Sequence, residues 1–513
     1  MPHRLATLAL STSALLAQGD YDLDKRTPGT LGSPLVVEVR GAPGNTFGIA
    51  MLAFTGGPTP LSLFIPGETR SLAVGTELAS NWYAFGIAAN GTATLQLGIP
   101  ANPAYADLRL WWQTLTLSPF GAAIDQISNP VRTQTGVAGT SLLAPASLQF
   151  ARAFAAGFFD RDDDGGAGNL VVAGGGGGSL TAATGLDSSE VWNFRTMTVT
   201  AGATMGTARA LHLAVPLQNG KVLLVGGADD TGTVLASCEL YDPATNGYAP
   251  TGSMSTARVL HAACRLADGR VMVAGGTSSL VDTTAAITNT LNTTQFYDPN
   301  TGTWSNGPNL GGRRLAPALT LLSNNQVMVS GGVEVGLFLG IPVSAVSTTA
   351  VQRWNPATNA RTNGPAMPVG PAGHQYNQVT LADGRVLLTG GTFVPNLLGA
   401  ANATPVAAAD VYNPTTNSWQ STTMASPRAL HTATRLPNGD VLVCGGAQGT
   451  LTAPSSIDGV ELFSASGNGW TTLPNLTSPR SGHVAAALPD GTVVLVGGQG
   501  AAATLTSVET VRL

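Results

Sequence analysis

The chain of 513 residues has little charge: 10% of its residues are charged, and Lys25 and Lys221 are its two lysines. The net charge is −5, and no segment collects basic residues, so we expect no nucleic-acid partner. Outside the N-terminus, no apolar run approaches the ~20 residues of a membrane helix, so we expect no membrane span. Low charge alone fits disorder, but regular apolar strands predict a packed β protein.

Cysteine is also scarce. The chain has three cysteines, Cys238, Cys264 and Cys444. An odd number without the spacing of metal ligands excludes a disulfide framework. Each cysteine lies in or beside a predicted strand, so we expect buried free thiols.

The N-terminus combines Arg4, an apolar stretch over residues 5–16, and small residues at Ala14 and Ala17. This pattern resembles a secretory signal peptide, which we place at residues 1–18. It predicts a protein that is secreted or lies at the cell surface or in the periplasm. A plain terminal tail is the alternative.

Short β segments separated by Gly, Pro and Asn turns follow from about residue 34 to residue 134. Such spacing is typical of an antiparallel β-sandwich. We therefore predict a sandwich domain over residues 19–135.

What is abundant is glycine, and it is arranged in repeats. Six Gly-Gly pairs each close a short apolar run, and a seventh pair, Gly174-Gly175, stands in a more divergent context. The first glycines recur 49–59 residues apart, a period that indicates one supersecondary unit used many times. The six pairs are Gly226-Gly227, Gly275-Gly276, Gly331-Gly332, Gly390-Gly391, Gly445-Gly446 and Gly497-Gly498.

Five repeats also carry an Asn-Gly or Asp-Gly hairpin before the pair, and six carry an aromatic residue after it, such as Tyr241 or Tyr297. A Gly-Gly pair after a β run, a downstream Tyr and then a Trp resembles the kelch repeat. The resemblance covers residues 136–513, and the YDPATN and YDPNTGTW turns resemble kelch proteins exported by bacteria. It implies four-stranded blades of a β-propeller. The predicted fold is all-β: a seven-bladed kelch-like β-propeller preceded by a small antiparallel β-sandwich.

The last repeat lacks a fourth strand, and the start of the repeat region can supply one. The last repeat stops at SVETVRL, aligned with a third strand. We expect a strand near residues 140–150 to supply the missing fourth strand. This pairing closes the ring and removes an exposed edge.

Five of the six histidines share one repeat position. Four of them follow an arginine by three residues, as in Arg209–His212, whereas Pro371 replaces the arginine before His374. Zinc needs imidazole nitrogens that converge within ~2.1 Å of one point, and equivalent positions in different blades are spread around a channel. We therefore predict a repeated structural hydrogen bond rather than a metal site.

Galactose oxidase is also built on kelch repeats, so copper chemistry must be considered. In that family a neighbouring Tyr-His pair, a second tyrosine and another histidine hold the metal. This sequence has no Tyr-His dipeptide, and His374-Gln375-Tyr376 has the reverse order. No ligand can be transferred residue by residue, and we predict no catalytic residue.

The first repeat contains an acidic loop. Asp160, Asp162 and Asp164 alternate before Gly165, as in calcium-binding loops. Alternate carboxylates in a tight turn can converge on a hard cation. Calcium is therefore the one cofactor that the sequence indicates, with a solvated acidic hairpin as the alternative.

Loop length indicates where binding takes place. From the first glycine of a pair to the next aromatic marker there are 15 residues in the second repeat, but 22 or 23 in the third to fifth. These insertions lie on one propeller face and carry apolar residues, which suggests a partner surface or loops that cover one another or the sandwich. The candidate binding residues are Leu337, Phe338, Leu339, Ile341, Phe393, Leu397 and Leu398.

The sequence thus favours an exported, noncatalytic protein that binds a protein or a glycan. The alternatives are a secreted carbohydrate-active or galactose-oxidase-like enzyme and a structural surface-layer component. Fold alone does not distinguish them.

Overall fold

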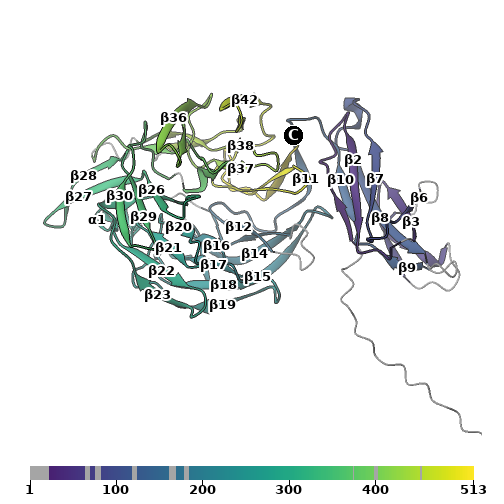
Figure 1. The fold of residues 1–513 in the computed structure, drawn as a ribbon, viewed down its shortest axis with the longest axis horizontal. Coiled ribbons are helices and arrows are strands. Elements are labelled where there is room, and N and C mark those ends of the chain that lie inside the picture. The colour runs from purple at the N-terminus through teal and green to yellow at the C-terminus, as the bar shows by residue number, and fades with distance from the viewer. Residues whose placement is uncertain are drawn as a thin grey trace, which may run out of the picture. The chain divides into compact units, whose positions relative to one another are not determined.

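The computed structural model of the protein describes residues 22–513 except residues 45, 64–69, 76–81, 118–123, 161–168, 178–183, 374, 398–402 and 451–452. The chain divides into two compact units (Figure 1). Unit 1 comprises residues 1–27, 32–99 and 108–134, and unit 2 comprises residues 28–31, 100–107 and 135–513. The described residues confirm the all-β class, since their helices are α1 (Thr283–Thr288) and the single turns η1 (Leu61–Leu63), η3 (Pro103–Tyr105) and η4 (Gln375–Asn377). None of these helices is long and apolar enough to cross a membrane.

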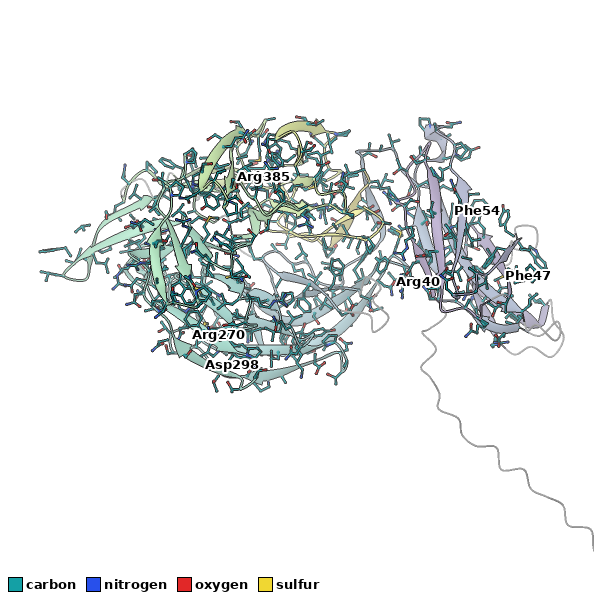
Figure 2. The ribbon with its side chains drawn as sticks, in the orientation of Figure 1. Arg40, Phe47, Phe54, Arg270, Asp298 and Arg385 are labelled. Carbon is teal, nitrogen blue, oxygen red and sulfur yellow. The ribbon has the colours of Figure 1, made fainter. Side chains whose placement is uncertain are left out.

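Unit 1 consists of antiparallel sheets. A three-stranded sheet has the order β1 (Asp22–Lys25), β2 (Pro34–Arg40), β7 (Ala93–Gly98). A second sheet has the order β10 (Val131–Gln134), β8 (Arg109–Leu117), β3 (Phe47–Ala53), β6 (Trp82–Gly86), with β9 (Ile124–Ile127) beside β8. The short strands β4 (Gly56–Pro60) and β5 (Ser71–Val74) pair with each other. Leu72, Leu115 and Ile124 belong to its core, whereas Phe47 and Phe54 are exposed on its surface (Figure 2).

Unit 2 contains, within its described residues, seven four-stranded antiparallel sheets, numbered here in chain order. Sheets 1 to 3 are β12 (Ala156–Phe159), β13 (Leu170–Ala173), β14 (Leu186–Asn193), β15 (Thr198–Arg209); β16 (Leu213–Pro216), β17 (Val222–Val225), β18 (Cys238–Asp242), β19 (Gly247–Thr251); and β20 (Ala262–Arg265), β21 (Val271–Ala274), β22 (Thr294–Asp298), β23 (Thr303–Asn306). Sheets 4 to 6 are β25 (Ala318–Leu321), β26 (Val327–Ser330), β29 (Val351–Asn355), β30 (Ala360–Asn363); β31 (Gln378–Thr380), β32 (Val386–Thr389), β35 (Ala408–Asn413), β36 (Ser418–Thr423); and β37 (Thr432–Arg435), β38 (Val441–Cys444), β41 (Val460–Ser464), β42 (Gly469–Leu473).

Sheet 7 joins the two ends of unit 2. It consists of β43 (Val484–Ala487), β44 (Val493–Val496), β45 (Ser507–Val511) and β11 (Ser141–Ser147). β11 pairs antiparallel with β45, and Ser141 lies opposite Val511. The edge of β45 is therefore covered by a strand from the other end of the repeat region.

The apolar run before each Gly-Gly pair forms the second strand of a sheet. All four residues of β17 are buried, and the same holds for β21 and β44. Both faces of each sheet are covered by neighbouring sheets, so these strands are continuously apolar rather than alternating. The next two strands bring paired aromatic rings together, as with Tyr297 and Trp304, whose centroids are 5.3 Å apart.

The seven sheets form a closed cycle. Each innermost strand contacts the innermost strands of two other sheets, in the order β12, β16, β20, β25, β31, β37, β43 and back to β12. An apolar cluster lies at every one of these interfaces, including that between sheets 7 and 1. Polar contacts add to the interfaces: Arg385 of sheet 5 donates to Asn468 Oδ1 and Ala465 O of sheet 6 (Figure 2).

The Gly-Gly pairs connect neighbouring sheets. In all seven pairs the second glycine donates its N–H to a carbonyl at the start of the segment that leads into the next sheet, at 2.8–3.1 Å. The acceptor is the residue at the arginine position, and Gly498 donates to Arg152 of sheet 1. A Cβ on Gly226 would lie 2.5 Å from Arg258 O and 3.2 Å from His261 Cε1, so no side chain fits there. The sequence signature is thus a requirement of the interface between sheets.

Candidate functional site

A cavity of about 430 Å³ opens within unit 2, and every one of the seven sheets contributes to its lining. This volume falls in the range of small-molecule pockets. Each sheet contributes the residue two positions after its arginine position. We call these seven residues the axial ring: Phe154, Leu211, Leu260, Ala316, Gly373, Leu430 and Gly482.

All seven axial-ring residues have a positive φ, between +50° and +74°. For Leu, Phe and Ala this left-handed conformation is uncommon and unfavourable. Backbone hydrogen bonds within the ring offset part of that cost: Phe154 donates to Gly482 O and Leu211 donates to Phe154 O, at 2.8 and 3.0 Å. Strain repeated around one cavity directs attention to that cavity as a functional site.

The inserted loops surround one end of the cavity. The third repeat inserts α1, the fourth inserts the hairpin β27 (Val333–Phe338) and β28 (Ile341–Ser347), and the fifth inserts the pair β33 (Thr392–Phe393) and β34 (Thr404–Pro405). β24 (Arg313–Leu315) pairs with β27, and sheet 6 adds the hairpin β39 (Ala447–Thr450) and β40 (Ala453–Ser456). Ile287, Val333 and Val394 line the cavity and belong to one apolar cluster. The insertions therefore build an apolar wall.

The cavity lining also contains polar side chains, and sheet 5 contributes Gln375 and Asn377. In sheet 2 the axial-ring residue Leu211 lies eight positions before Asn219 of the first hairpin. In sheet 5 the axial-ring residue Gly373 lies ten positions before the equivalent Asp383. The two extra residues are absorbed in η4, which precedes the shortened strand β31. We call Gln375–Asn377 the sheet 5 bulge.

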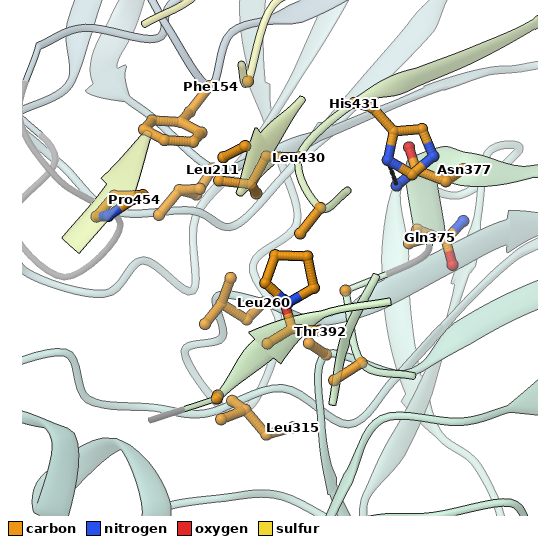
Figure 3. A pocket seen from close by; sticks show the side chains of 18 of the residues that line it. Phe154, Leu211, Leu260, Leu315, Gln375, Asn377, Thr392, Leu430, His431 and Pro454 are labelled. Carbon is orange, nitrogen blue, oxygen red and sulfur yellow. Dashed lines mark hydrogen bonds between the residues drawn. The ribbon is translucent and has the colours of Figure 1, made fainter. Parts of the chain in front are cut away.

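The sheet 5 bulge reaches across to other sheets. The amide of Gln375 accepts from Leu319 N at 2.7 Å and donates to Ala263 O at 3.2 Å. The amide of Asn377 lies 3.3 Å from Nδ1 of His431, while Thr389 Oγ1 lies 2.9 Å from its Nε2. Figure 3 shows these amides and His431 on one side of the cavity and Phe154, Leu211 and Leu430 on another. The length difference that signals this bulge is visible in the sequence, although the repeat analysis did not use it.

Four histidines occupy equivalent positions behind the axial ring, and all four are buried. Burial, with the nearby charge of Arg209, lowers the pKa of His212 to about 3, and burial with Arg258 does the same for His261. Burial likewise holds the pKa values of His431 and His483 well below the usual range. All four imidazoles are therefore neutral at physiological pH.

The histidines do not converge as metal ligands do. Each ring packs against the first glycine of the preceding sheet, as His212 does against Gly174. The expected repeated hydrogen bond is present in part: His483 Nε2 lies 2.9 Å from Thr432 Oγ1, but both ring nitrogens of His261 have no partner among the described residues. The described residues contain no group of three His, Cys, Asp or Glu side chains that could hold a metal.

The arginines of the repeat are structural. Arg428 Nη1 donates to Gly445 O and Gly459 O at 2.9 Å, and its Nη2 lies 2.6 Å from Glu461 Oε1. Sheets 1, 2 and 7 repeat this buried pair with Glu190, Glu239 and Glu509. In sheet 5, Pro371 takes the place of the arginine and Asp410 that of the glutamate, and burial raises the pKa of Asp410.

Among the described residues that line the cavity, none has a charged side chain. The lining consists of apolar residues, glycines, histidines, Gln, Asn and Thr. Because its histidines are neutral, the described part of the lining carries no net charge at physiological pH.

The predicted binding residues lie on the inserted loops, but in two different environments. Leu337 and Leu397 pack against the apolar cluster of the insertions. Phe338, Leu339, Ile341 and Phe393 are exposed, with Leu339 the most exposed at 87%. Leu398 lies outside the described residues.

Of the predicted calcium ligands, Asp160 is described, whereas Asp162 and Asp164 lie outside the described residues. Asp160 Oδ2 accepts from Asn169 Nδ2 at 3.2 Å across the base of the loop. The calcium site stays a prediction.

Comparisons with known proteins place the fold. No family model matches the chain, and no curated protein matches it. Among solved structures, a fungal alcohol oxidase of the AA5 family, determined in complex with copper, is similar with a TM-score of 0.51. It is 16% identical, and the match covers 72% of this chain and 75% of that one. The chain therefore has an all-β fold like that of the galactose-oxidase type, and the identity is too low to extend the likeness to activity.

The copper of that neighbour can be tested against the residues of this chain. Copper needs several nitrogen or oxygen ligands directed at one point. None of the described tyrosine side chains lines the cavity, and the hydroxyls of Tyr241, Tyr297 and Tyr412 bond to Asn246, Thr251 and Asn417. His374 and the side chain of Tyr376 are not described. The described residues do not fit a copper site.

Proposed function

We propose that unit 2 is a seven-bladed kelch-type β-propeller formed by residues 136–513, closed by the strand near residues 140–150, and that residues 19–135 form a β-sandwich. The seven Gly-Gly pairs, the seven four-stranded sheets and the pairing of β11 with β45 support this. Export by the signal peptide of residues 1–18 belongs to the same proposal and rests on the sequence pattern.

The function that the geometry supports best is binding of a small, mainly apolar molecule in the axial cavity. One observation carries this proposal: a cavity of about 430 Å³ that all seven sheets line and that the inserted loops surround at one end. Variable loops around a rigid scaffold are the usual place for function.

A neutral fluorophore such as N-phenyl-1-naphthylamine tests this function. The full-length protein should bind one molecule, with a fluorescence increase. Leu260→Trp fills the cavity and should abolish binding, whereas Leu339→Trp on the exposed hairpin should leave it unchanged. Absence of stoichiometric binding, or full binding by Leu260→Trp, would contradict the proposal.

Protein or glycan binding by the exposed tips Phe338, Leu339, Ile341 and Phe393 stays a separate proposal. Replacing residues 337–343 by a short Gly-Ser turn distinguishes its alternatives. Loss of partner capture at unchanged stability supports binding, and loss of stability supports docking within the molecule.

The enzyme alternative is favoured over that loop-binding proposal by one observation, the structural likeness to a copper alcohol oxidase. Loading with Cu²⁺ followed by desalting tests it. An equimolar copper content with a Cu²⁺ resonance in electron paramagnetic spectra would support the alternative, and a metal-free protein would reject it.

A further inference from the structure

We propose that sheet 5 binds a monovalent metal cation at the position where the other six sheets hold the guanidinium of an arginine. Its protein ligands are Gly390 O, Ala408 O and the carboxylate of Asp410. This inference is independent of ligand binding in the axial cavity, because it concerns the interior of one sheet.

In six of the seven sheets an arginine makes the same two backbone contacts. Its Nη1 donates to the carbonyl of the first glycine of the Gly-Gly pair in its own sheet, at 2.7–3.3 Å. The same Nη1 also donates to a carbonyl at the start of the third strand. These sheets therefore each place one positive charge beside two backbone oxygens. The six arginines are Arg152, Arg209, Arg258, Arg314, Arg428 and Arg480.

Sheet 5 has the two carbonyls without the arginine. Pro371 stands at the arginine position and has no side-chain donor. Gly390 N donates to Ala408 O at 2.9 Å, as Gly445 N donates to Gly459 O in sheet 6, so these carbonyls are equivalent. Gly390 is buried, and its carbonyl accepts no hydrogen bond from any described residue. A buried carbonyl without a donor is uncommon and costly.

Asp410 supplies a negative charge beside these carbonyls. It lies opposite Leu388, one position along from the pair of Thr389 and Ala409, in the register that Glu461 has in sheet 6. Its carboxyl accepts hydrogen bonds from Ser421 and from the backbone of Val369. The side chain is buried, and no described positive side chain offsets that burial. A buried carboxylate without a cation is strongly destabilising.

The composition of the site selects the class of cation. Carbonyl and carboxylate oxygens are ligands of hard cations, and carbonyls replace the hydration shell of K⁺ in proteins that bind it. One carboxylate balances one positive charge, as Glu461 balances Arg428, whereas a divalent ion leaves a buried charge in excess. Two of the three ligands are backbone oxygens, so the site needs no cluster of acidic, His or Cys side chains.

Sheet 6 provides a matched control. Asp410→Asn removes the charge of the proposed site at nearly constant shape, and Glu461→Gln makes the same change where Arg428 is present. The repeat accommodates glutamine at this position, since Gln295 Oε1 of sheet 3 accepts from Arg258 Nη2 at 3.3 Å. Both variants should lose stability, but only Asp410→Asn should lose its response to the cation.

Thermal unfolding of the full-length protein at pH 8 tests the site. Each variant is compared in KCl and in tetramethylammonium chloride, both at about 100 mM, because the methyl groups of the latter cation keep oxygen ligands from its charge. A ligand that binds only the folded state raises the melting temperature. Wild type and Glu461→Gln should melt at least about 2 °C higher in KCl, and Asp410→Asn should melt equally in both salts.

A second variant replaces the cation by the side chains of sheet 6. Pro371→Arg/Asp410→Glu introduces an arginine and a glutamate into sheet 5, and it should melt at the same temperature in both salts. If this variant does not fold, Asp410→Asn decides alone. Equal melting temperatures of the wild type in the two salts, or a full response to KCl in Asp410→Asn, would overturn the inference.

Discussion

At the scale of residues, unit 2 repeats one buried polar unit. In sheets 2, 6 and 7 an arginine holds backbone carbonyls and pairs with a glutamate, while a neutral histidine packs against the Gly-Gly pair of the neighbouring sheet. These side chains are charged or polar, yet they serve the packing of sheets. The sequence alone identifies these arginines, glutamates and histidines, but only their burial shows that their role is structural rather than catalytic.

Removing one member of the buried pair should be costly. Arg428→Met leaves Glu461 buried without its cation, and we expect the free energy of unfolding to fall by about 3–5 kcal/mol. The double variant Arg428→Met/Glu461→Leu should recover much of that loss. Urea unfolding of both variants measures it, and a single variant that is as stable as the double one would contradict this account.

The histidines predict a pH dependence. Their folded-state pKa values lie far below the unfolded value of about 6.5, so between these values the unfolded state binds protons that the folded state does not. Stability should be complete above pH 6.5 and fall as the pH drops, by about 1.4 kcal/mol per pH unit for each histidine. Urea unfolding at pH 7.5 and pH 5 checks the sign. His212→Gln should make the dependence shallower by one histidine's share.

At the scale of elements, the departures from the repeat carry the site. The insertions form α1, the hairpin of β27 and β28, and the pair of β33 and β34, and two extra residues in sheet 5 form the bulge at Gln375–Asn377. The spacing of Gly-Gly pairs and aromatics predicted that loops would differ, and it located them correctly in the chain. It left open whether these residues face a partner or pack within the molecule, and Leu337 and Leu397 pack within it, because an apolar residue in a loop is compatible with either environment.

The turn between β27 and β28 has a sequence that a substitution can make more stable. Leu339 and Gly340 form a two-residue turn with φ values of +51° and +80°, where Asn-Gly is the preferred sequence. Leu339→Asn should raise the free energy of unfolding by up to about 1 kcal/mol. Phe338→Asn, at a paired strand position, should bring no gain. A loss of stability in Leu339→Asn would show that the exposed leucine has a contact of its own.

At the scale of the whole molecule, the seven sheets of unit 2 form a ring in which sheet 7 packs against sheet 1. The N–H of Gly498 donates to Arg152 O just as the other second glycines donate to the next sheet. The apolar cluster between sheets 7 and 1 includes Leu148, Trp192 and Val494. Closure is therefore made both by β11 and by the same interface that joins all other sheets.

Deleting residues 136–150 tests closure. The deletion removes β11 and exposes the edge of β45, so we expect a sharp fall in the melting temperature and aggregation on heating. Replacing residues 337–343 by a Gly-Ser turn is the control for a chain alteration elsewhere in unit 2. An unchanged melting temperature after the deletion would show that the ring does not depend on β11.

The sequence by itself determined the all-β class, the repeat and its period, because glycine pairs and apolar runs are local necessities of every sheet interface. The tertiary structure alone decided that Leu211, Leu260 and Leu430 adopt positive φ values around one cavity, since nothing in the Arg-x-Leu-His pattern requires that conformation. It alone distinguished His261 from His212, which the sequence presents as equivalent. Identical repeat positions face different surroundings once the insertions and the bulge break the symmetry of the ring, and only packing in space reveals those surroundings.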